Sequence, residues 1–371
     1  MSADVREPAS GRRRQLNALL LASALPMPAL LRAEDAGPEG PVGPVGPPFR
    51  VIDIDWFDAA RSRAVPARLY WPAQTSSAEG VPLVVFSHGI GGSRQGYSYL
   101  GRHWSSRGVA SLHVQHAGSD AAVWRGNPFG IVGRLRAAAQ ESEAIARAAD
   151  VRFALDRMLS DETGPLGRAI DRRRVVAAGH SYGANTTLLS IGAQVVREGR
   201  VVTCQDERFS AGIVISAPPF YGERDLAAVL GHVSVPTVHI TATEDVIEIP
   251  GYRSGAADRL QVFDAIGDPR KLLAVFQAGS HSIFTDRSLT GGAALNPKVK
   301  LATAELGLAF LDLTFKDDGA ALAQWRTTWQ PLLARAPEAG FPPRHAAMQT
   351  ATHTAMNTAM NTAAHTALDA A

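Results

Sequence analysis

The order of strand-like and helix-like runs is the feature that most limits what this chain can fold into. Short apolar runs rich in β-branched residues recur eight times, each the length of one strand. They cover residues 50–57, 67–72, 82–89, 109–116, 174–181, 209–218, 236–243 and 271–279. Two follow one another at the start, and helical stretches separate most of the later ones. This order predicts one mostly parallel sheet with helices on both faces.

The helical stretches carry apolar residues at three- and four-residue spacing, which is typical of an amphipathic helix. They cover residues 97–107, 134–160, 184–198, 259–266 and 298–315. A chain of 371 residues has ample length for one α/β domain and two flanking segments. We therefore expect one catalytic domain over residues 50–340.

The segment before this domain reads as an export signal. Three consecutive arginines at positions 12 to 14 precede an apolar run over residues 16–31. Two prolines interrupt that run, and it is too short for a membrane span. Residues 1–36 thus resemble a twin-arginine signal, which predicts a periplasmic or secreted protein. The alternative is a cytoplasmic protein with a disordered N-terminus.

Two further segments have compositions that cannot form a core. Residues 37–49 are rich in proline and glycine and predict a linker. Residues 341–371 repeat threonine, alanine, methionine and asparagine, and predict a disordered tail.

Charge and cysteine content exclude several classes of function. The chain has 37 Lys and Arg against 35 Asp and Glu, and the body of the chain has no basic stripe. Nucleic acid is therefore not an expected partner. The single cysteine, Cys204, excludes an internal disulfide and any Cys-x-x-Cys metal or redox site. We expect it to be a buried apolar thiol.

A serine stands between two glycines where a strand-like run meets a helical one. The segment is "VVAAGHSYGANTT", with Ser181 two residues from both Gly179 and Gly183. A sharp strand-to-helix turn lifts the serine above the sheet and crowds its neighbours, so small residues are needed on both sides. The same turn aims the first amides of the helix at the space beside the hydroxyl. Ser181 is therefore the predicted nucleophile.

A serine hydroxyl needs a base, and the base needs an orienting acid. In this type of site both follow the serine along the chain, the acid before the histidine. His281 comes just after the last strand-like run, and Asp245 comes just after the preceding one. We predict that Asp245 holds His281 and that His281 takes the Ser181 proton. Glu244 is the alternative acid, disfavoured because the shorter side chain is the usual orienter.

The negative charge that develops during such a reaction needs backbone N–H donors. The segment "FSHGIGGSRQGY" follows an early strand and has the open backbone that this requires. We expect the amide of Ile90 or of Gly89 to act with the amide of Tyr182.

The remaining histidines suggest packing or bracing. His180 adjoins Ser181 in sequence, but neighbouring side chains diverge at a tight turn, so we expect it to be packed and hydrogen-bonded. His88 is expected to brace the oxyanion segment. No histidine pair has metal-ligand spacing, so no metal site is predicted.

Taken together, these motifs resemble the α/β-hydrolase superfamily. The resemblance rests on "LVVFSHGIGGSRQGYSYLGRHWSSRGV", "VVAAGHSYGANTT", "VPTVHITATEDV" and "AGSHSIFTD". Within the superfamily the pattern is similar to bacterial proteins described as predicted dienelactone hydrolases, relatives of platelet-activating-factor acetylhydrolase and of cutinase-like polyester hydrolases. The resemblance implies the α/β-hydrolase fold with a mostly parallel eight-stranded sheet.

The motifs and the resemblance predict a serine hydrolase that cleaves carboxylic esters through an acyl-enzyme, without a cofactor. The alternatives are an acyltransferase with the same residues, a dienelactone or lipid-ester hydrolase, and a binding protein on a hydrolase fold. True dienelactone hydrolases use a cysteine where this chain has Ser181, which favours ordinary ester hydrolysis. The expected partner is a small-molecule, lipid or polyester ester, and the expected state is a monomer.

Clues to the substrate are few. Tyr97, Trp124, Phe129 and Phe220 are candidates for lining an acyl pocket, although each is equally compatible with packing of its own loop. The segment over residues 217–235 is too short for a large lid. We therefore expect a small lid or none, and an open site for short or extended acyl esters.

Overall fold

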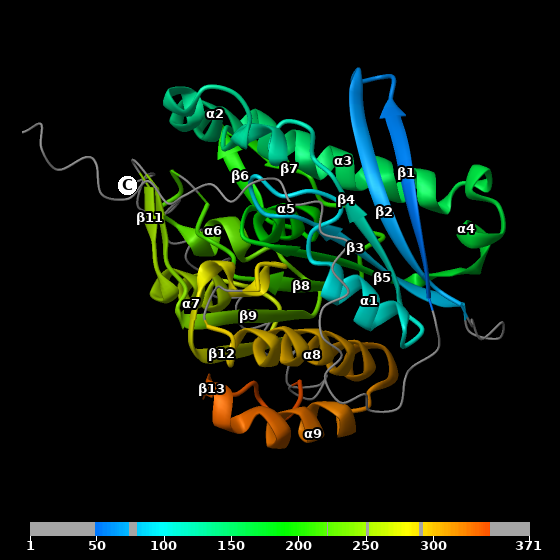
Figure 1. The fold of residues 1–371 in the computed structure, drawn as a ribbon, viewed down its shortest axis with the longest axis vertical. Helices are drawn as coiled ribbons and strands as arrows, with labels where there is room; N and C mark the ends of the chain where they lie inside the picture. The colour runs from blue at the N-terminus through cyan, green and yellow to red at the C-terminus, as the bar shows by residue number, and fades with distance from the viewer. Residues whose placement is uncertain (1–48, 74–79, 221, 250–251, 289–291, 342–371) are drawn as a thin grey trace, which may run out of the picture. The chain divides into compact units, whose positions relative to one another are not determined.

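The structure, a computed structural model, describes residues 49–73, 80–220, 222–249, 252–288 and 292–341 (Figure 1). The predicted export signal and all but the last residue of the predicted linker lie outside these residues. So does the predicted tail, apart from its first residue. The first strand begins at Phe49, one residue before the expected start of the domain.

A nine-stranded sheet forms the centre of the fold (Figure 1). Its first three neighbours, β1, β2 and β4, pair antiparallel, and the pairs from β4 to β12 are parallel. The last strand, β13, runs antiparallel to β12. In spatial order the strands are β1 (Phe49–Asp58), β2 (Arg63–Pro72), β4 (Ala110–Val114), β3 (Val81–Ser87), β5 (Ile170–His180), β8 (Ala211–Ile215), β9 (Thr237–Glu244), β12 (Lys271–Ser280) and β13 (Leu333–Arg335).

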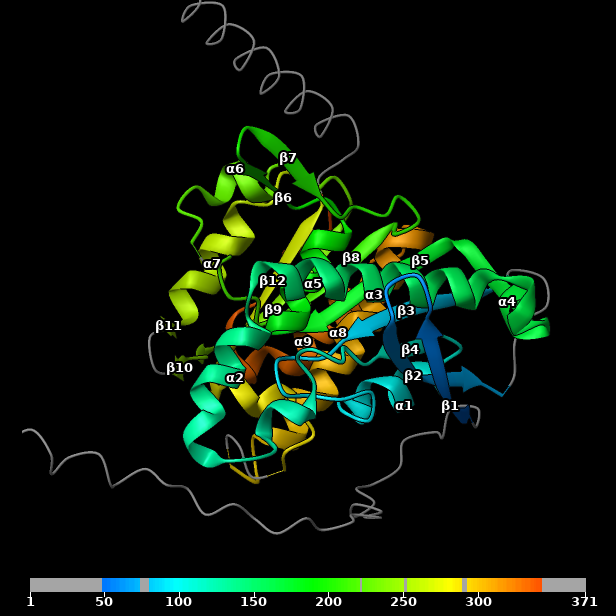
Figure 2. The same cartoon turned by 90° about the horizontal axis from the view of Figure 1, so that it is seen from above.

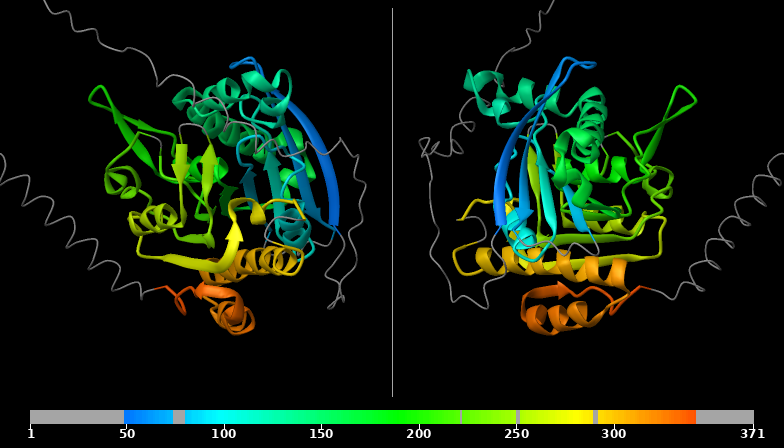
Figure 3. Two further views of the ribbon diagram at one scale, coloured as in Figure 1. Left: turned by 60° about the vertical axis from the view of Figure 1, so that its left-hand side comes forward. Right: turned by 90° about the vertical axis from the view of Figure 1, so that its right-hand side faces the viewer.

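Helices cover the sheet on both faces, as Figures 2 and 3 show. On one face α3 (Glu141–Leu159) lies beside α5 (Tyr182–Ser190), and their apolar residues share a core with one side of the strands. On the other face α1 (Ser98–Ser105), α8 (Asn296–Lys316) and α9 (Ala320–Trp329) share a second core with the opposite side. This double cover explains why β4 and β8 are buried at every residue.

All eight strands expected from the sequence are present, so the prediction of a mostly parallel sheet between helices is confirmed. The ninth strand, β13, is only three residues long and carries no pattern of its own. Two small hairpins are also additional. They are β6 (Gln194–Arg197) with β7 (Arg200–Thr203), and β10 (Ile247–Ile249) with β11 (Tyr252–Ser254).

The expected helices have different limits in the structure. The stretch over residues 134–160 is two helices, α2 (Ile131–Ala138) and α3, because the backbone at Gln140 is extended. The stretch over residues 184–198 ends at Ser190, because Gly192 has a positive φ of 127° and β6 follows. The helices α4 (Pro165–Ala169), α6 (Leu226–Leu230) and α9 were not expected; α7 (Ala256–Asp264) starts three residues before its expected position.

The parallel strands end at one edge of the sheet, where sites form in open α/β folds. The carboxyl ends of β3, β5, β8, β9 and β12 meet there. Among the helices that the structure describes, none is long and apolar enough to cross a membrane.

Candidate active site

Ser181 occupies the sharp turn between β5 and α5. Its φ is 57°, a left-handed value that is unfavourable for a residue other than glycine and persists only where the surroundings enforce it. A Cβ on Gly179 would lie 2.2 Å from the Gly183 carbonyl oxygen, and a Cβ on Gly183 would lie 1.9 Å from the Ser87 carbonyl oxygen. The glycines on both sides are thus required by close backbone packing.

Three residues from three strand ends form one line of hydrogen bonds. The Ser181 Oγ lies 2.8 Å from His281 Nε2, and His281 Nδ1 lies 2.7 Å from Asp245 Oδ1. Asp245 follows β9, and His281 opens the short helix η4 (His281–Phe284) after β12. The carboxylate fixes the proton on Nδ1, so Nε2 is free to accept the serine proton.

The Asp245 carboxylate is buried and has polar partners on both oxygens. The Thr241 hydroxyl donates to Oδ2 at 2.7 Å, and Ser216 Oγ also contacts Oδ2 while lying 2.9 Å from His281 Nδ1. The Arg259 guanidinium lies 3.4 Å from Oδ1. Burial raises the pKa of Asp245, but the hydrogen bond to His281 and the charges of His281 and Arg259 outweigh it and hold that pKa well below its ordinary value. The carboxylate is therefore ionised at every working pH.

These supporting residues differ in how visible they are in the sequence. Ser216 directly follows β8, so its place at the same edge of the sheet could have been inferred. Arg259 comes from α7, and no motif connects that helix to the site. Glu244, the alternative acid, has an exposed side chain, and the structure brings Asp245 to His281 instead.

The expected oxyanion segment lies against the serine. A Cβ on Gly89 would lie 3.3 Å from the Ser181 Cβ. The Gly89 amide donates to the Tyr97 hydroxyl at 3.2 Å, so it has another partner. Within the described part of the chain, no acceptor takes the Ile90 or the Tyr182 amide. These two amides can therefore accept a ligand, while that of Gly89 is engaged.

His180 joins the oxyanion segment to the segment of His281. Its Nε2 donates to the His281 carbonyl at 3.0 Å, which leaves Nδ1 to accept from the Tyr97 hydroxyl at 2.8 Å. The two imidazole rings lie 4.7 Å apart. Burial lowers the pKa of His180 well below its usual value, so the ring is neutral. It is packed and hydrogen-bonded, as expected from the sequence.

The four candidate pocket aromatics have different surroundings. Tyr97 is buried, and its hydroxyl accepts from the Gly89 amide and donates to His180 Nδ1. These contacts connect two segments of the site and do not line a pocket. Trp124 is 44% exposed and its Nε1 donates to the Gly91 carbonyl at 2.9 Å, so it lies against the oxyanion segment. Phe129 is 96% exposed, and Phe220 is partly buried against the core under α5.

His88 has the contacts expected of a brace. Its Nε2 accepts from the His116 backbone N–H at 3.1 Å, so Nδ1 carries the proton and donates to the Gly89 carbonyl at 2.7 Å. Burial lowers the pKa of His88 well below its usual value. Cys204 was expected to be a buried thiol, but it is only half-buried, and this burial raises the pKa of the thiol.

Comparison with known proteins finds relatives for parts of this chain. Residues 59–125 match the family model of platelet-activating factor acetylhydrolase, isoform II. The chain is 24% identical over 264 residues to platelet-activating factor acetylhydrolase of Cavia porcellus, covering 64% of this chain and 55% of that protein. The corresponding protein of Bos taurus is 26% identical over 177 residues, which cover 40% of this chain and 37% of that protein. The chain thus spans about half or less of the length of these relatives.

A solved structure shares the fold. It is a ferulic acid esterase from Streptomyces cinnamoneus, with a TM-score of 0.50 and 22% sequence identity, covering 76% of this chain and 93% of that one. Together with the sheet order, this similarity shows the α/β-hydrolase fold.

Proposed function

We propose that this α/β-hydrolase is a serine esterase that hydrolyses carboxylic esters through an acyl-enzyme. The observation that carries the proposal is the line of hydrogen bonds from Ser181 through His281 to Asp245. It ends beside two amides, those of Ile90 and Tyr182, that have no acceptor among the described residues. Nucleophile, base, orienting acid and oxyanion donors are thus all within one site.

In this mechanism the Ser181 oxygen attacks the ester carbonyl while its proton passes to His281 Nε2. The carbonyl oxygen becomes an oxyanion, and the Ile90 and Tyr182 amides stabilise it together with the N-terminus of α5. The carbon–oxygen bond to the alcohol then breaks, and His281 returns the proton to the leaving alcohol. Water attacks the acyl-serine by the same route and releases the acid.

The environment of His281 supports its role as a base. The ionised Asp245 holds Nδ1–H and stabilises the imidazolium that forms during each transfer. Ser216 Oγ contacts both partners of that pair, so it supports their placement next to one another.

We propose esters with short acyl groups as the first substrates to test. The relatives are named acetylhydrolases, and the segment between β8 and β9 contributes only the short helix α6, which supports an open site. Lipid and polyester esters are the wider class of candidate substrates.

The test is labelling with a fluorophosphonate followed by a p-nitrophenyl ester series from acetate to palmitate. We expect the probe to modify Ser181 alone and hydrolysis to decline as the acyl chain lengthens. Ser181→Ala should abolish labelling and lower kcat by roughly 10⁴-fold, with an unchanged circular dichroism spectrum. Normal hydrolysis by that variant would refute the proposal. Faster alcoholysis than hydrolysis of one ester would instead identify a transferase.

We also propose that the protein is exported and monomeric. Export is supported by the arginines and the apolar run before residue 36. Fractionation of cells producing the full chain tests it, with lysine in place of Arg12 and Arg13 as the control that should retain the protein inside. Light scattering tests the monomer.

A further inference from the structure

One peptide group of the oxyanion segment is held on both sides. It is the peptide between His88 and Gly89, directly before Ile90. Its carbonyl oxygen accepts a short hydrogen bond from the Arg147 guanidinium, and its N–H donates to the Tyr97 hydroxyl at 3.2 Å. A peptide held by both its oxygen and its hydrogen cannot rotate. The next peptide carries the Ile90 N–H and is held through its Gly89 carbonyl oxygen, which accepts from His88 Nδ1 at 2.7 Å and from the Gly92 N–H at 3.0 Å.

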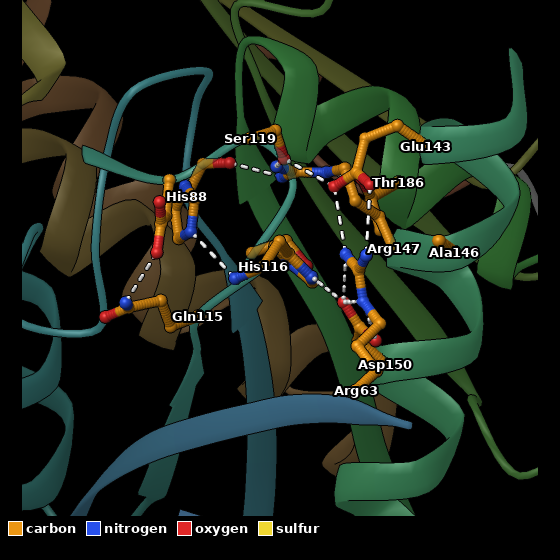
Figure 4. A network of polar contacts seen from close by, with 12 residues as sticks. Arg63, His88, Gln115, His116, Ser119, Glu143, Ala146, Arg147, Asp150 and Thr186 are labelled. Atoms are coloured by element: carbon orange, nitrogen blue, oxygen red, sulfur yellow. Dashed lines mark hydrogen bonds and ion pairs between the residues drawn. The ribbon is translucent and has the colours of Figure 1, made fainter. Parts of the chain in front are cut away.

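Arg147 also contacts the segment that carries the other oxyanion amide. It comes from α3 and is fully buried. The carbon of its guanidinium lies 4.5 Å from the centre of the Tyr182 ring, and Nε donates to the Thr186 hydroxyl on α5 at 2.9 Å (Figure 4). One side chain thus joins the residue before the Gly89–Ile90 turn to the start of α5.

We propose that Arg147 is the positioning residue of the oxyanion hole, setting the Ile90 and Tyr182 amides relative to one another. The inference rests on the proposed esterase function and adds to it a residue outside the line of Ser181, His281 and Asp245. Arg147 touches no reacting atom and acts through the backbone that it binds.

The charge of this guanidinium is directed at the carbonyl. Burial lowers the pKa of Arg147 to about 10, so it is still protonated at neutral pH. No carboxylate of the described residues lies within ion-pair distance of it. Glu143 reaches it only through the Ser119 hydroxyl, which receives from Arg147 at 2.7 Å and donates to Glu143 at 2.9 Å. The His88 carbonyl is therefore a main partner of a buried cation, and hydrogen bonds to charged groups are the stronger kind.

A second arginine of the same network provides a matched control. Arg63 binds Glu143 at 3.0 Å and Asp150 at 2.9 Å from the outer side (Figure 4). It carries the carboxylate contacts that Arg147 lacks and has no contact with the His88 carbonyl. Its replacement disturbs the network without releasing the oxyanion peptide.

The experiment compares Arg147→Met, Arg147→Lys and Arg63→Met on p-nitrophenyl acetate and its thionoester. A thionoester places sulfur, a weak hydrogen-bond acceptor, where the oxyanion forms, so the wild-type protein should prefer the oxygen ester strongly. Arg147→Met should lower kcat on the oxygen ester by about 10²-fold with KM within a few-fold. Because the thionoester gains little from the amides, its rate should change less, and the preference should fall by at least about 10-fold. Arg147→Lys should keep part of the preference for the oxygen ester, and Arg63→Met should leave that preference unchanged.

Tyr97→Phe tests the other side of the same peptide if Arg147→Met does not fold. It removes the hydroxyl that accepts from the Gly89 amide and donates to His180 Nδ1. The preference for the oxygen ester should again fall, by a smaller factor. Wild-type preference in a folded Arg147→Met, or in Tyr97→Phe where Arg147→Met does not fold, would overturn the inference. If the wild-type protein has no esterase activity and is not labelled by the fluorophosphonate, the proposed function is refuted instead. Failure of the inference and failure of the proposed function can therefore be told apart.

Discussion

The carboxylate of Asp245 lies 3.4 Å from the guanidinium of Arg259, and both side chains are buried. In the proposed mechanism, Asp245 is thus shared between two positively charged partners, Arg259 and the imidazolium that His281 becomes in each proton transfer. The charge of Arg259 is one of the causes that hold the pKa of Asp245 well below its ordinary value, after the hydrogen bond and the charge of His281. This arrangement has a direct consequence for the pH dependence of activity.

Arg259→Gln should move the acid limb of kcat/KM to higher pH. Without the guanidinium, the charged imidazole is better stabilised by Asp245, and a higher pH is needed to obtain the neutral base. Arg270→Gln is the control, since Arg270 pairs with Asp268 near the surface at 2.6 Å. A limb that stays in place, or that moves to lower pH, would contradict this role of Arg259.

The acid limb should also correspond to a single proton. Burial lowers the pKa of His180, His88 and His116 well below the usual histidine value, so these rings stay neutral as the pH falls through the range in which activity is lost. Activity is lost at low pH because the base works only when neutral. A profile of kcat/KM for His180→Asn should keep the limb, whereas His281→Asn should have no measurable turnover. A limb with a slope of two would assign a second titrating group.

Asp245→Asn and Glu244→Gln should differ by orders of magnitude. The amide at position 245 would favour the wrong imidazole tautomer, and kcat should fall by roughly 10³- to 10⁴-fold. The exposed Glu244 has no hydrogen bond or ion pair with His281 among the described residues, so its variant should have nearly normal kcat. The reverse ranking in steady-state kinetics would return the acid role to Glu244.

Gly183→Ala should not be tolerated. Its Cβ would lie 1.9 Å from the Ser87 carbonyl oxygen, and that oxygen belongs to a strand that cannot move without breaking the sheet. We expect loss of activity together with a lower melting temperature. Gly133→Ala is the matched control, because this position in α2 has no atom within 4 Å of the added Cβ. Alanine there should raise the free energy of unfolding by about 0.5–1 kcal/mol. Equal melting temperatures for the two variants would contradict the packing argument.

The features that the sequence predicted are those with a local pattern. Strands covered on both faces are continuous apolar runs, so all eight could be located, and Ser181 lies in a turn that only small neighbours permit. The partners of Ser181 followed from the order of strands, because parallel strands deliver their ends to one edge.

The features that the sequence did not predict depend on side chains that reach across the fold. Arg147 projects from α3 to the His88 carbonyl, and Arg259 projects from α7 to the Asp245 carboxylate. From the sequence alone, an arginine on an amphipathic helix is expected to face solvent. The sequence predicts a helix that continues through β6, because a short run of valines is ambiguous until the turn at Gly192 is known.

The packing of Gly183 against Ser87 also bears on how the protein acquires its activity. The turn at Ser181 is unfavourable by itself and is enforced by a strand about a hundred residues earlier in the chain. Helix α5 can form early from local contacts, but the reactive geometry of the serine requires β3 and β5 to be paired. During refolding, enzymatic activity should therefore return later than the helical signal. A catalytic assay would thus report when β3 and β5 have paired, which makes the activity of Ser181 a probe of long-range strand pairing.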